Sequence, residues 1–214
     1  MKEAEIADKN IFMMCAAPNR AALSEMPGGY SIRNCRRDEL DVWKAMPFDD
    51  SETAKKSKNY MDDFFAETYG GKENLFFAKT LFVCDRSDKP VATCLIWKAY
   101  DKFNTIHWFK VLKTHEGRGI GRALLSVLMR DLKAADYPVY LHTQPGSFRA
   151  IKLYSDFGFS LLAGDKFGSR KNDLNECLPI LKEFMPENYF RNLRITNAPK
   201  EFKKVLDEYD TFQF

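Results

Sequence analysis

The stretch Val111 to Leu125, VLKTHEGRGIGRALL, holds three alternating glycines between two apolar runs of different period. The run before them, Thr105 to Leu112, is rich in β-branched and aromatic residues, which is typical of a strand. The run after them, Ile120 to Lys133, has apolar residues three and four positions apart, which predicts an amphipathic helix. Glycines at such a junction let the backbone turn tightly, and the helix N-terminus offers unpaired N–H groups and the positive end of its dipole. The stretch therefore predicts a turn that binds a phosphate.

The same glycines have a second interpretation, a tight strand-to-helix connection that binds nothing. Two known phosphate-binding loops do not match, because a P-loop needs GK[ST] after its second glycine and a dinucleotide-binding loop needs GxGxxG near the first strand. Arg118 within the run and Arg122 directly after it can contribute positive charge to a phosphate ligand. By itself, the glycine run indicates an anion at a helix start and leaves the ligand open.

The runs on both sides of the turn predict a mixed sheet. Upstream, three apolar and β-branched runs separated by short polar breaks predict an antiparallel meander. Downstream, a strand, a helix and a further strand follow, and strands joined through a helix run parallel by a right-handed crossover. The predicted strands are Asn74 to Cys84, Val91 to Tyr100, Thr105 to Leu112, Pro138 to Thr143 and Phe159 to Ala163, and the second helix is Ser147 to Phe157. The predicted fold class is α/β, with a mixed, mostly antiparallel sheet and helices on both faces.

The chain divides into three predicted parts. Residues 1–29 are expected to be an N-terminal accessory segment, residues 30–171 the main domain, and residues 172–214 a C-terminal helical appendage. The breaker Pro27-Gly28-Gly29 sets the first boundary. The remaining expected elements are a short helix at Asn19 to Ser24, a strand at Tyr30 to Asn34, and helices at Asp38 to Met46, Ser57 to Glu67 and Asn175 to Phe184.

Composition narrows the class of protein. The 214 residues are 45% hydrophobic and 29% charged with a net charge of +3, as in an ordinary globular protein. The small and mixed charge argues against a nucleic-acid partner. Five scattered cysteines without a CxxC pair predict free buried thiols rather than disulfides or a zinc site. We expect no signal peptide, no membrane partner, a cytoplasmic location, and a monomer or homodimer.

Two motifs resemble those of the GNAT superfamily of N-acetyltransferases. Glu116 to Gly121, EGRGIG, is similar to the family's acyl-CoA signature Q/R-x-x-G-x-G/A. Ala150 to Phe159, AIKLYSDFGF, is similar to its A-x-x-L-Y-x-x-x-G-F element. The resemblance implies a sheet whose parallel strand pair is splayed at the acyl-CoA site, with acetyl-CoA as cofactor. Glu116 departs from the signature, and because a carboxylate would repel a pyrophosphate we expect it to point away or to cap its own helix.

The resemblance also implies site residues. Tyr154 matches the tyrosine that acts as general acid toward the departing thiolate in much of the family, although an aromatic that packs the helix on the sheet is the alternative. Ser147 stands where many members have an asparagine near pantetheine, and it reaches less far. The backbone N–H groups of Phe109 and Val111 would hold the acetyl carbonyl and pantetheine. The full set of expected cofactor-binding residues is Phe109, Val111, Arg118, Gly119, Ile120, Gly121, Arg122 and Ser147.

The general base has three candidates. His107 lies on the predicted strand before Val111, where many family members have a glutamate, a histidine or a bound water, and packing beside Trp108 is its alternative role. His142, at the end of the next strand, can serve instead as base or contact the substrate, and a water is the third candidate. Neither histidine has ligand spacing with another metal-binding residue, so no metal site is expected.

The acceptor is the least defined part. In the family, variable early helices and loops build the acceptor site, here about Met46 to Tyr69 and the tail. Four acidic residues of this region can attract a cationic amine or simply form a solvated helix face, namely Asp49, Asp50, Asp62 and Asp63. The expected function is transfer of an acetyl group from acetyl-CoA to a primary amine, with a small, amino-acid-like acceptor favoured over a protein. The alternative is a non-catalytic acyl-CoA-binding, sensing or interaction module.

Overall fold

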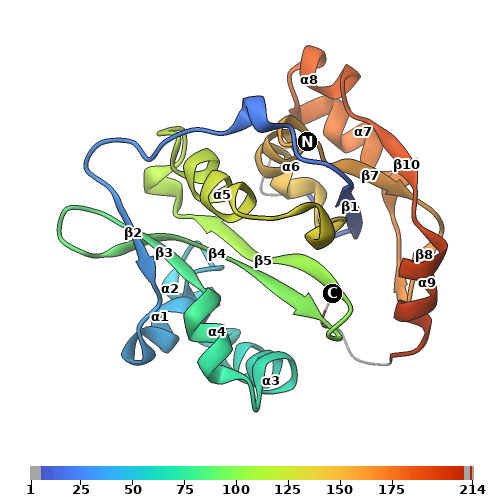
Figure 1. The fold of residues 1–214 in the computed structure, drawn as a ribbon. Helices are drawn as coiled ribbons and strands as arrows, with labels where there is room; N and C mark the ends of the chain where they lie inside the picture. The colour runs from blue at the N-terminus through green and yellow to red at the C-terminus, as the bar shows by residue number, and fades with distance from the viewer. Residues whose placement is uncertain (1–5, 210–212, 214) are drawn as a thin grey trace.

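The computed structural model describes residues 6–209 and 213. Its centre is an eight-stranded sheet in the order β10-β7-β1-β6-β5-β4-β3-β2, and β8 and β9 form a separate hairpin (Figure 1). The strands are β1 Ile11–Cys15, β2 Ser31–Asn34, β3 Leu81–Cys84, β4 Pro90–Ala99, β5 Phe103–Val111, β6 Val139–Thr143, β7 Ser160–Ala163, β8 Lys166–Phe167, β9 Arg170–Lys171 and β10 Ile195–Asn197. The helices are α1 Leu40–Ala45, α2 Ser51–Lys56, α3 Lys58–Tyr69, α4 Glu73–Lys79, α5 Ile120–Arg130, α6 Phe148–Asp156, α7 Leu174–Phe184, α8 Glu187–Arg191 and α9 Lys200–Asp207.

The sheet is mixed, as the sequence predicts. Strands β2, β3, β4 and β5 form an antiparallel meander. Helix α5 then returns the chain to β6, which pairs with β5 in parallel. The predicted α/β class with a mostly antiparallel sheet is therefore confirmed.

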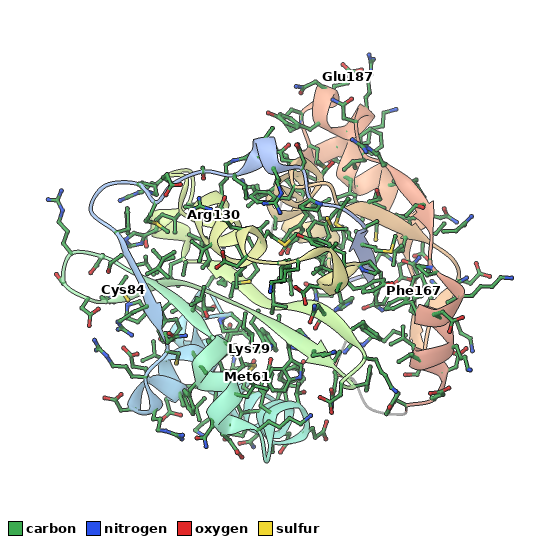
Figure 2. The ribbon with its side chains drawn as sticks, in the orientation of Figure 1. Met61, Lys79, Cys84, Arg130, Phe167 and Glu187 are labelled. Atoms are coloured by element: carbon green, nitrogen blue, oxygen red, sulfur yellow. The ribbon has the colours of Figure 1, made fainter. Side chains whose placement is uncertain are left out.

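Helices cover both faces of the sheet (Figure 1). On one face, α5, α6 and α7 bury an aliphatic core that includes Leu124, Ile151 and Leu181. On the other face, α1, α3 and α4 cover the meander with an aromatic cluster around Trp43. The remaining part of that face is covered by α9 and the β8–β9 hairpin, where Phe167 packs on Phe202 with ring centroids 5.8 Å apart (Figure 2).

Strand β1 is an interior strand that sequence analysis did not predict. It lies between β6 and β7 and is antiparallel to both, so β6 and β7 run parallel as expected but do not touch. All five of its residues, IFMMC, are buried. A strand covered on both faces shows no apolar-polar alternation, which removes the period-two signal. This part of the segment predicted as accessory therefore belongs to the sheet.

Two further differences come from long-range contacts. Residues 74–79 were expected to begin a strand, but they lie in α4, where Phe76 is buried against the aromatic cluster. In the tail, β10 pairs in parallel with β7, so the C-terminal region extends the sheet as well as adding helices. Both elements form because they pack on segments that lie far away in the sequence. A short apolar run does not indicate which distant segment it will pack on.

Strands β5 and β6 separate where the site lies. They pair only at Asn104 with Val139 and at Thr105 with Tyr140. Beyond these positions β5 carries a bulge, because its register with β4 shifts between the pair Leu95–His107 and the pair Thr93–Lys110. Trp108, inside the bulge, has a φ of 52°. The bulge bends β5 away from its neighbour and opens a gap in the sheet. The splayed parallel pair that the resemblance implies is present.

No helix of the described chain is both long enough and apolar enough to cross a membrane.

Candidate functional site

Two cavities meet at the gap between β5 and β6. The larger has a volume of about 930 Å³ and lies along the glycine turn and the N-terminus of α5. The smaller has a volume of about 580 Å³ and lies beside His107 and His142. Phe109, Ser147 and Ala150 line both cavities. The split sheet therefore joins a site for one ligand to a site for another.

The glycine turn presents unpaired backbone donors to the larger cavity. Gly117 and Gly119 have φ values of 73° and 81°, a left-handed region that favours glycine. No side chain caps α5, and its first intrahelical bond runs from the Ala123 N–H to the Gly119 carbonyl at 3.0 Å. The N–H groups of Ile120, Gly121 and Arg122 thus lack intrahelical acceptors. Gly119 to Arg122 line the cavity, so these donors suit an anion.

Gly121 also brings the helix close to β5. A Cβ at this position would lie 3.1 Å from Phe109 Cζ and 3.4 Å from Val111 Cγ2. A larger residue would therefore require the Phe109 side chain, or α5 itself, to shift by a few tenths of an ångström at the junction of the two cavities.

Basic side chains surround the larger cavity. Besides Arg122, its lining includes four basic residues that sequence analysis did not select: Lys110, Lys113, His115 and Arg149. Each of the four lies within two positions of Val111, Glu116 or Ser147, which the sequence had singled out, and this proximity could have identified them. Asp49 also lines the cavity and pairs with Lys110 at 2.6 Å and with Lys113 at 2.9 Å. The charges of the residues that line the larger cavity therefore add up to a net positive charge, which favours phosphate binding.

The two arginines of the motif differ in position. Arg122 lines the larger cavity, where it donates to the Ala22 carbonyl at 3.2 Å and pairs with Asp156. Arg118 donates to the Tyr30 hydroxyl at 3.1 Å and to the Thr114 carbonyl at 2.9 Å, and its side chain is not among those that line either cavity.

Glu116 lies at the cavity rather than away from it. It lines the larger cavity and makes no hydrogen bond to another described residue, so it does not cap α5, whereas the direction of its carboxylate stays a prediction. Glu116 is exposed to solvent, which weakens its repulsion of a bound anion.

The edge of β5 that faces the gap offers further donors. The Leu112 N–H donates at 2.9 Å to the carbonyl of Val91 in β4, on the side of β5 that faces away from the gap. Because successive N–H groups of a strand point to opposite edges, those of Val111 and Phe109 point toward the gap. Both residues line the larger cavity. Their role in binding the acetyl carbonyl and pantetheine stays a prediction.

Tyr154 lines the smaller cavity beside Phe109, which lines both. It is buried on α6, with its ring centroid 5.6 Å from that of Phe109 and 5.7 Å from that of Phe159, and it lines the smaller cavity. Its hydroxyl makes no hydrogen bond to any other described residue. Burial raises the pKa of Tyr154 well above its usual value, so the phenol stays protonated at neutral pH. The ring packs α6 on the sheet, and the role of the hydroxyl as an acid stays a prediction.

His107 is buried and fully hydrogen-bonded. Its Nδ1 lies 2.8 Å from the Tyr69 hydroxyl. Burial lowers the pKa of His107 to about 3, although a hydrogen bond to the backbone of Gln213 opposes the drop. Because a backbone hydrogen bond raises an imidazole pKa only where the ring donates, the other nitrogen, Nε2, carries the proton, and Nδ1 accepts from the Tyr69 hydroxyl, which burial keeps protonated. The imidazole is neutral, and its lone pair is taken.

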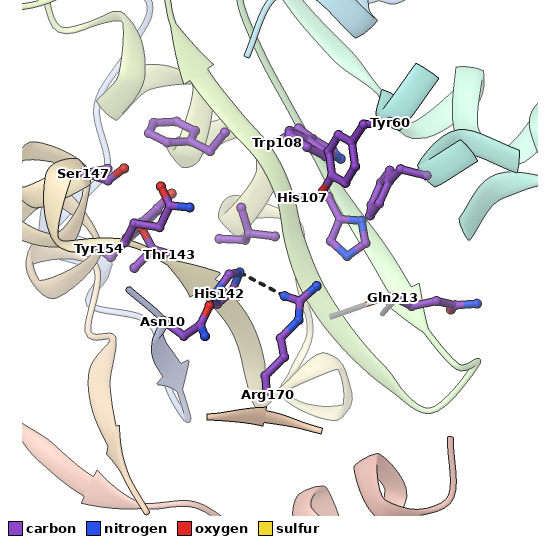
Figure 3. A pocket seen from close by; sticks show the side chains of 15 residues that line it. Asn10, Tyr60, His107, Trp108, His142, Thr143, Ser147, Tyr154, Arg170 and Gln213 are labelled. Atoms are coloured by element: carbon purple, nitrogen blue, oxygen red, sulfur yellow. Dashed lines mark hydrogen bonds between the residues drawn. The ribbon is translucent and has the colours of Figure 1, made fainter. Parts of the chain in front are cut away.

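His142 is held in the same way. An arginine can only donate, so the contact of 3.1 Å between Arg170 Nη1 and His142 Nδ1 makes Nδ1 an acceptor. The other nitrogen, Nε2, then carries the proton and donates to Asn10 Oδ1 at 2.8 Å. Burial and the charge of Arg170 lower the pKa of His142 to about 3. Figure 3 shows His142 and Arg170 joined across the cavity floor.

The acidic residues expected near the acceptor lie outside the smaller cavity. Asp49 pairs with lysines at the larger cavity, and Asp50 caps α2 through the N–H groups of Glu52 and Thr53. Asp62 pairs with Lys44 and Lys58. These carboxylates, together with the exposed Asp63, do not line the smaller cavity. Arg170 does, and no local sequence pattern singled it out.

Comparison with known proteins places this geometry in one family. A family model described as the acetyltransferase (GNAT) family matches residues 42–159, more than half of the chain. No curated protein matches the sequence. A GCN5-related N-acetyltransferase from Sphaerobacter thermophilus is similar at 21% identity and a TM-score of 0.50, over 72% of this chain and 49% of that one.

Two other solved structures share the fold. One is a tandem GNAT protein from the clavulanic acid biosynthesis pathway, with 10% identity and a TM-score of 0.53, over 72% of this chain and 50% of that one. The other is a Drosophila protein with 16% identity and a TM-score of 0.51, over 72% and 48%. The chain spans about half the length of these structures. With the family match, the glycine turn at α5 and the splayed strands β5 and β6, the chain belongs to the GNAT acetyltransferase family.

Proposed function

We propose that the chain is an acetyl-CoA-dependent N-acetyltransferase that acts on the primary amine of a small molecule. One observation carries the proposal: an anion-binding cavity and a polar cavity meet at Phe109, Ser147 and Ala150, with Tyr154 beside the junction. Acyl transfer needs two substrates whose reacting atoms come together at one point. The junction of the cavities is such a point.

The residues of the larger cavity fit acetyl-CoA. The free N–H groups at the start of α5, with Arg122, suit its pyrophosphate, and the basic side chains around them suit its further phosphate. Ser147 and the gap-facing N–H groups of Phe109 and Val111 suit the polar groups of pantetheine and the thioester carbonyl. Acetyl-CoA, when bound, supplies an acetyl group activated as a thioester.

Tyr154 acts as the general acid in this proposal. The acceptor enters as an ammonium ion and must first lose one proton. In the overall exchange, a bond forms between the amine nitrogen and the acetyl carbon, and the bond from that carbon to sulfur breaks. The nitrogen loses a second proton, and the sulfur takes the phenol proton of Tyr154, which is then restored from solvent. One proton is released in total for each amide and free thiol formed.

Water is the proposed base. The lone pairs of both histidines are occupied, His107 Nδ1 by Tyr69 and His142 Nδ1 by Arg170. A pKa of about 3 also makes either imidazole a poor acceptor for the proton of an ammonium ion. We therefore assign His107 to shaping the cavity and positioning the acceptor, with deprotonation by water in the open cavity.

Replacement of Tyr154 by phenylalanine tests the proposal. Steady-state release of free CoA thiol, with a panel of primary amines, should show kcat lower by about 100-fold in Tyr154→Phe, because the departing sulfur loses its proton donor. The KM for acetyl-CoA should stay within about threefold, since the phenol contributes to the chemical step rather than to binding.

A matched variant controls for loss of a buried phenol. The hydroxyl of Tyr137 is buried outside both cavities and bonds to no described partner, so Tyr137→Phe should keep wild-type kcat. Equal kcat in Tyr154→Phe and Tyr137→Phe would refute the acid role. Tight acetyl-CoA binding with no acetylated amine in mass spectra would favour the non-catalytic binding module instead.

A further inference from the structure

One wall of the smaller cavity is aromatic. Tyr60 and Phe64 from α3 and Trp108 from β5 line it, and these three residues are called the aromatic wall below. Figure 3 shows Tyr60 and Trp108 on one side of the cavity and Tyr154 on the other. Neighbouring rings on one wall of a cavity form a continuous apolar surface, which is the kind of surface that binds an apolar group of a ligand.

The bulge in β5 places Trp108 on this wall. In a regular strand, successive side chains point to opposite faces of the sheet. Phe64 of α3 nevertheless contacts the successive residues His107 and Trp108, with ring centroids 6.4 Å and 5.1 Å away. The φ of 52° at Trp108, which is unusual for a bulky residue, accompanies this arrangement. The backbone is therefore strained at the residue that presents its indole to the cavity.

Contacts within the protein hold two rings of the wall in place. The Trp108 ring meets that of Trp43 at 6.0 Å and that of Phe64 at 5.1 Å, both edge to face. Burial raises the pKa of Tyr69, and a hydrogen bond from the Trp108 side chain opposes the rise, so the indole N–H donates to the Tyr69 hydroxyl. The Phe64 ring also meets that of Tyr69 at 5.8 Å. Rings held in this way lose little freedom when a ligand packs on them.

Tyr60 differs from the other two members of the wall because it packs little against the protein. It is 57% exposed, and it belongs to none of the hydrophobic clusters that the described residues form. Its ring meets that of Phe64 at 6.4 Å, with an angle of 35° between the planes. Packing within the protein accounts for Phe64 and Trp108, whereas it does not account for an exposed ring at Tyr60. That ring is accessible from the cavity that it lines.

We propose that the acceptor is a primary amine that carries an aromatic ring, and that this ring packs against Tyr60, Phe64 and Trp108. The inference rests on the proposed N-acetyltransferase function and adds the chemical class of the acceptor. Aromatic rings prefer tilted and edge-to-face neighbours, and the members of the wall are already arranged in this way. A cavity of about 580 Å³ holds a ring and a short linker. With its ring on the wall, the acceptor directs its amine across the cavity toward Tyr154.

Matched amines test the proposal. Benzylamine, 2-phenylethylamine and 3-phenylpropylamine are assayed with acetyl-CoA, each beside its cyclohexyl analogue, by CoA release and by mass spectrometry of the product. The members of a pair share their charge and linker and differ in the aromatic character of the ring. We expect at least one aromatic amine to exceed its analogue in kcat/KM by about 5- to 10-fold, since contacts between aromatic rings add to the burial of apolar surface. It should exceed propylamine by about 100-fold, since propylamine buries no ring.

Variants assign the effect to the aromatic wall. Tyr60→Ala should raise the KM for the preferred aromatic amine about tenfold and reduce its advantage over the cyclohexyl analogue to about twofold or less, with the KM for acetyl-CoA unchanged. Tyr60→Phe, which keeps the ring, should restore the preference. Leu75→Ala removes an exposed apolar side chain from α4, outside both cavities, and should behave as the unmodified chain.

Several outcomes would overturn the proposal. One is equal kcat/KM for every aromatic amine and its cyclohexyl analogue in the unmodified chain, and another is a preference that survives in Tyr60→Ala. A third is a higher kcat/KM for 1,5-diaminopentane than for any aromatic amine, which would mean that the wall binds a second ammonium group over its ring faces. In these three cases the acetylated product still supports the proposed function. If acetyl-CoA binds and no amine is acetylated, propylamine included, the N-acetyltransferase function itself fails, and the acceptor class fails with it.

Discussion

The two buried histidines should make the stability of the fold depend on pH already between pH 7 and pH 5, above the range in which most carboxylates titrate. Burial lowers the pKa of His107 and of His142 from 6.5 to about 3. In the unfolded chain both return to the usual value, so between about pH 6.5 and pH 3 the unfolded state binds more protons than the folded state. The free energy of unfolding must then fall as the pH falls through this window.

The size of the effect follows from the two pKa values. Between pH 7 and pH 5, each histidine should lower the free energy of unfolding by about 2 kcal/mol, and the pair by about 4 kcal/mol. Aspartates and glutamates remain ionised in both states over this interval and contribute little. Urea unfolding followed by tryptophan fluorescence at pH 7 and at pH 5 gives the difference directly.

Variants of the single histidines separate the contributions of His107 and His142 to this pH dependence. His107→Gln and His142→Gln should each lose about half of the pH dependence, whatever their stability at pH 7, because only the difference between the two pH values is compared. His115→Gln, which removes the third histidine from the larger cavity, should keep the dependence of the unmodified chain. Equal pH dependence in all four proteins would refute the claim that the two imidazoles are buried in neutral form.

Two further predictions concern the larger cavity. Gly121→Ala should raise the KM for acetyl-CoA about tenfold, because the new Cβ would lie 3.1 Å from Phe109 Cζ and force that ring to shift at the junction. Gly28→Ala, with open space around its Cβ, should leave the KM unchanged. An unchanged KM in Gly121→Ala would show that the helix can shift without cost. Asp49→Asn should lower the KM for acetyl-CoA about threefold in low salt, since the two lysines that it pairs with lose a competing carboxylate, and the gain should vanish in high salt. A KM that is the same in both salts for both proteins would contradict this account.

The sequence predicted correctly those elements whose conformation depends on residues close together in the chain. The glycines at 117, 119 and 121 set the turn because φ values near 80° and a close helix–strand approach are properties of single residues. The meander from β3 to β5 was expected from apolar and β-branched runs separated by polar breaks, and the parallel return to β6 from the helix between the strands. Tyr154, Phe109 and Ser147, which were expected to contact acetyl-CoA, line the cavities, and their roles stay predictions.

The residues around the smaller cavity could not be assigned from the sequence alone. Asp62 was one of the acidic candidates for binding an amine, yet it pairs with Lys44 and Lys58 outside the smaller cavity. His107 and His142 were candidate bases because an isolated histidine titrates near neutrality. Burial and their hydrogen-bond partners, Tyr69 and Arg170, changed both the charge state and the free lone pair.

The sequence by itself determined the glycine turn, the strand and helix beside it, and the order of the elements that form the split sheet. Tertiary structure alone decided that β1 lies inside the sheet, and that Arg170 on a two-residue strand reaches the same cavity as Tyr154. The physical reason is the range of the interactions involved. Backbone geometry and apolar periodicity act between residues a few positions apart, whereas burial, electrostatic potential and cavity lining depend on segments that only folding brings together.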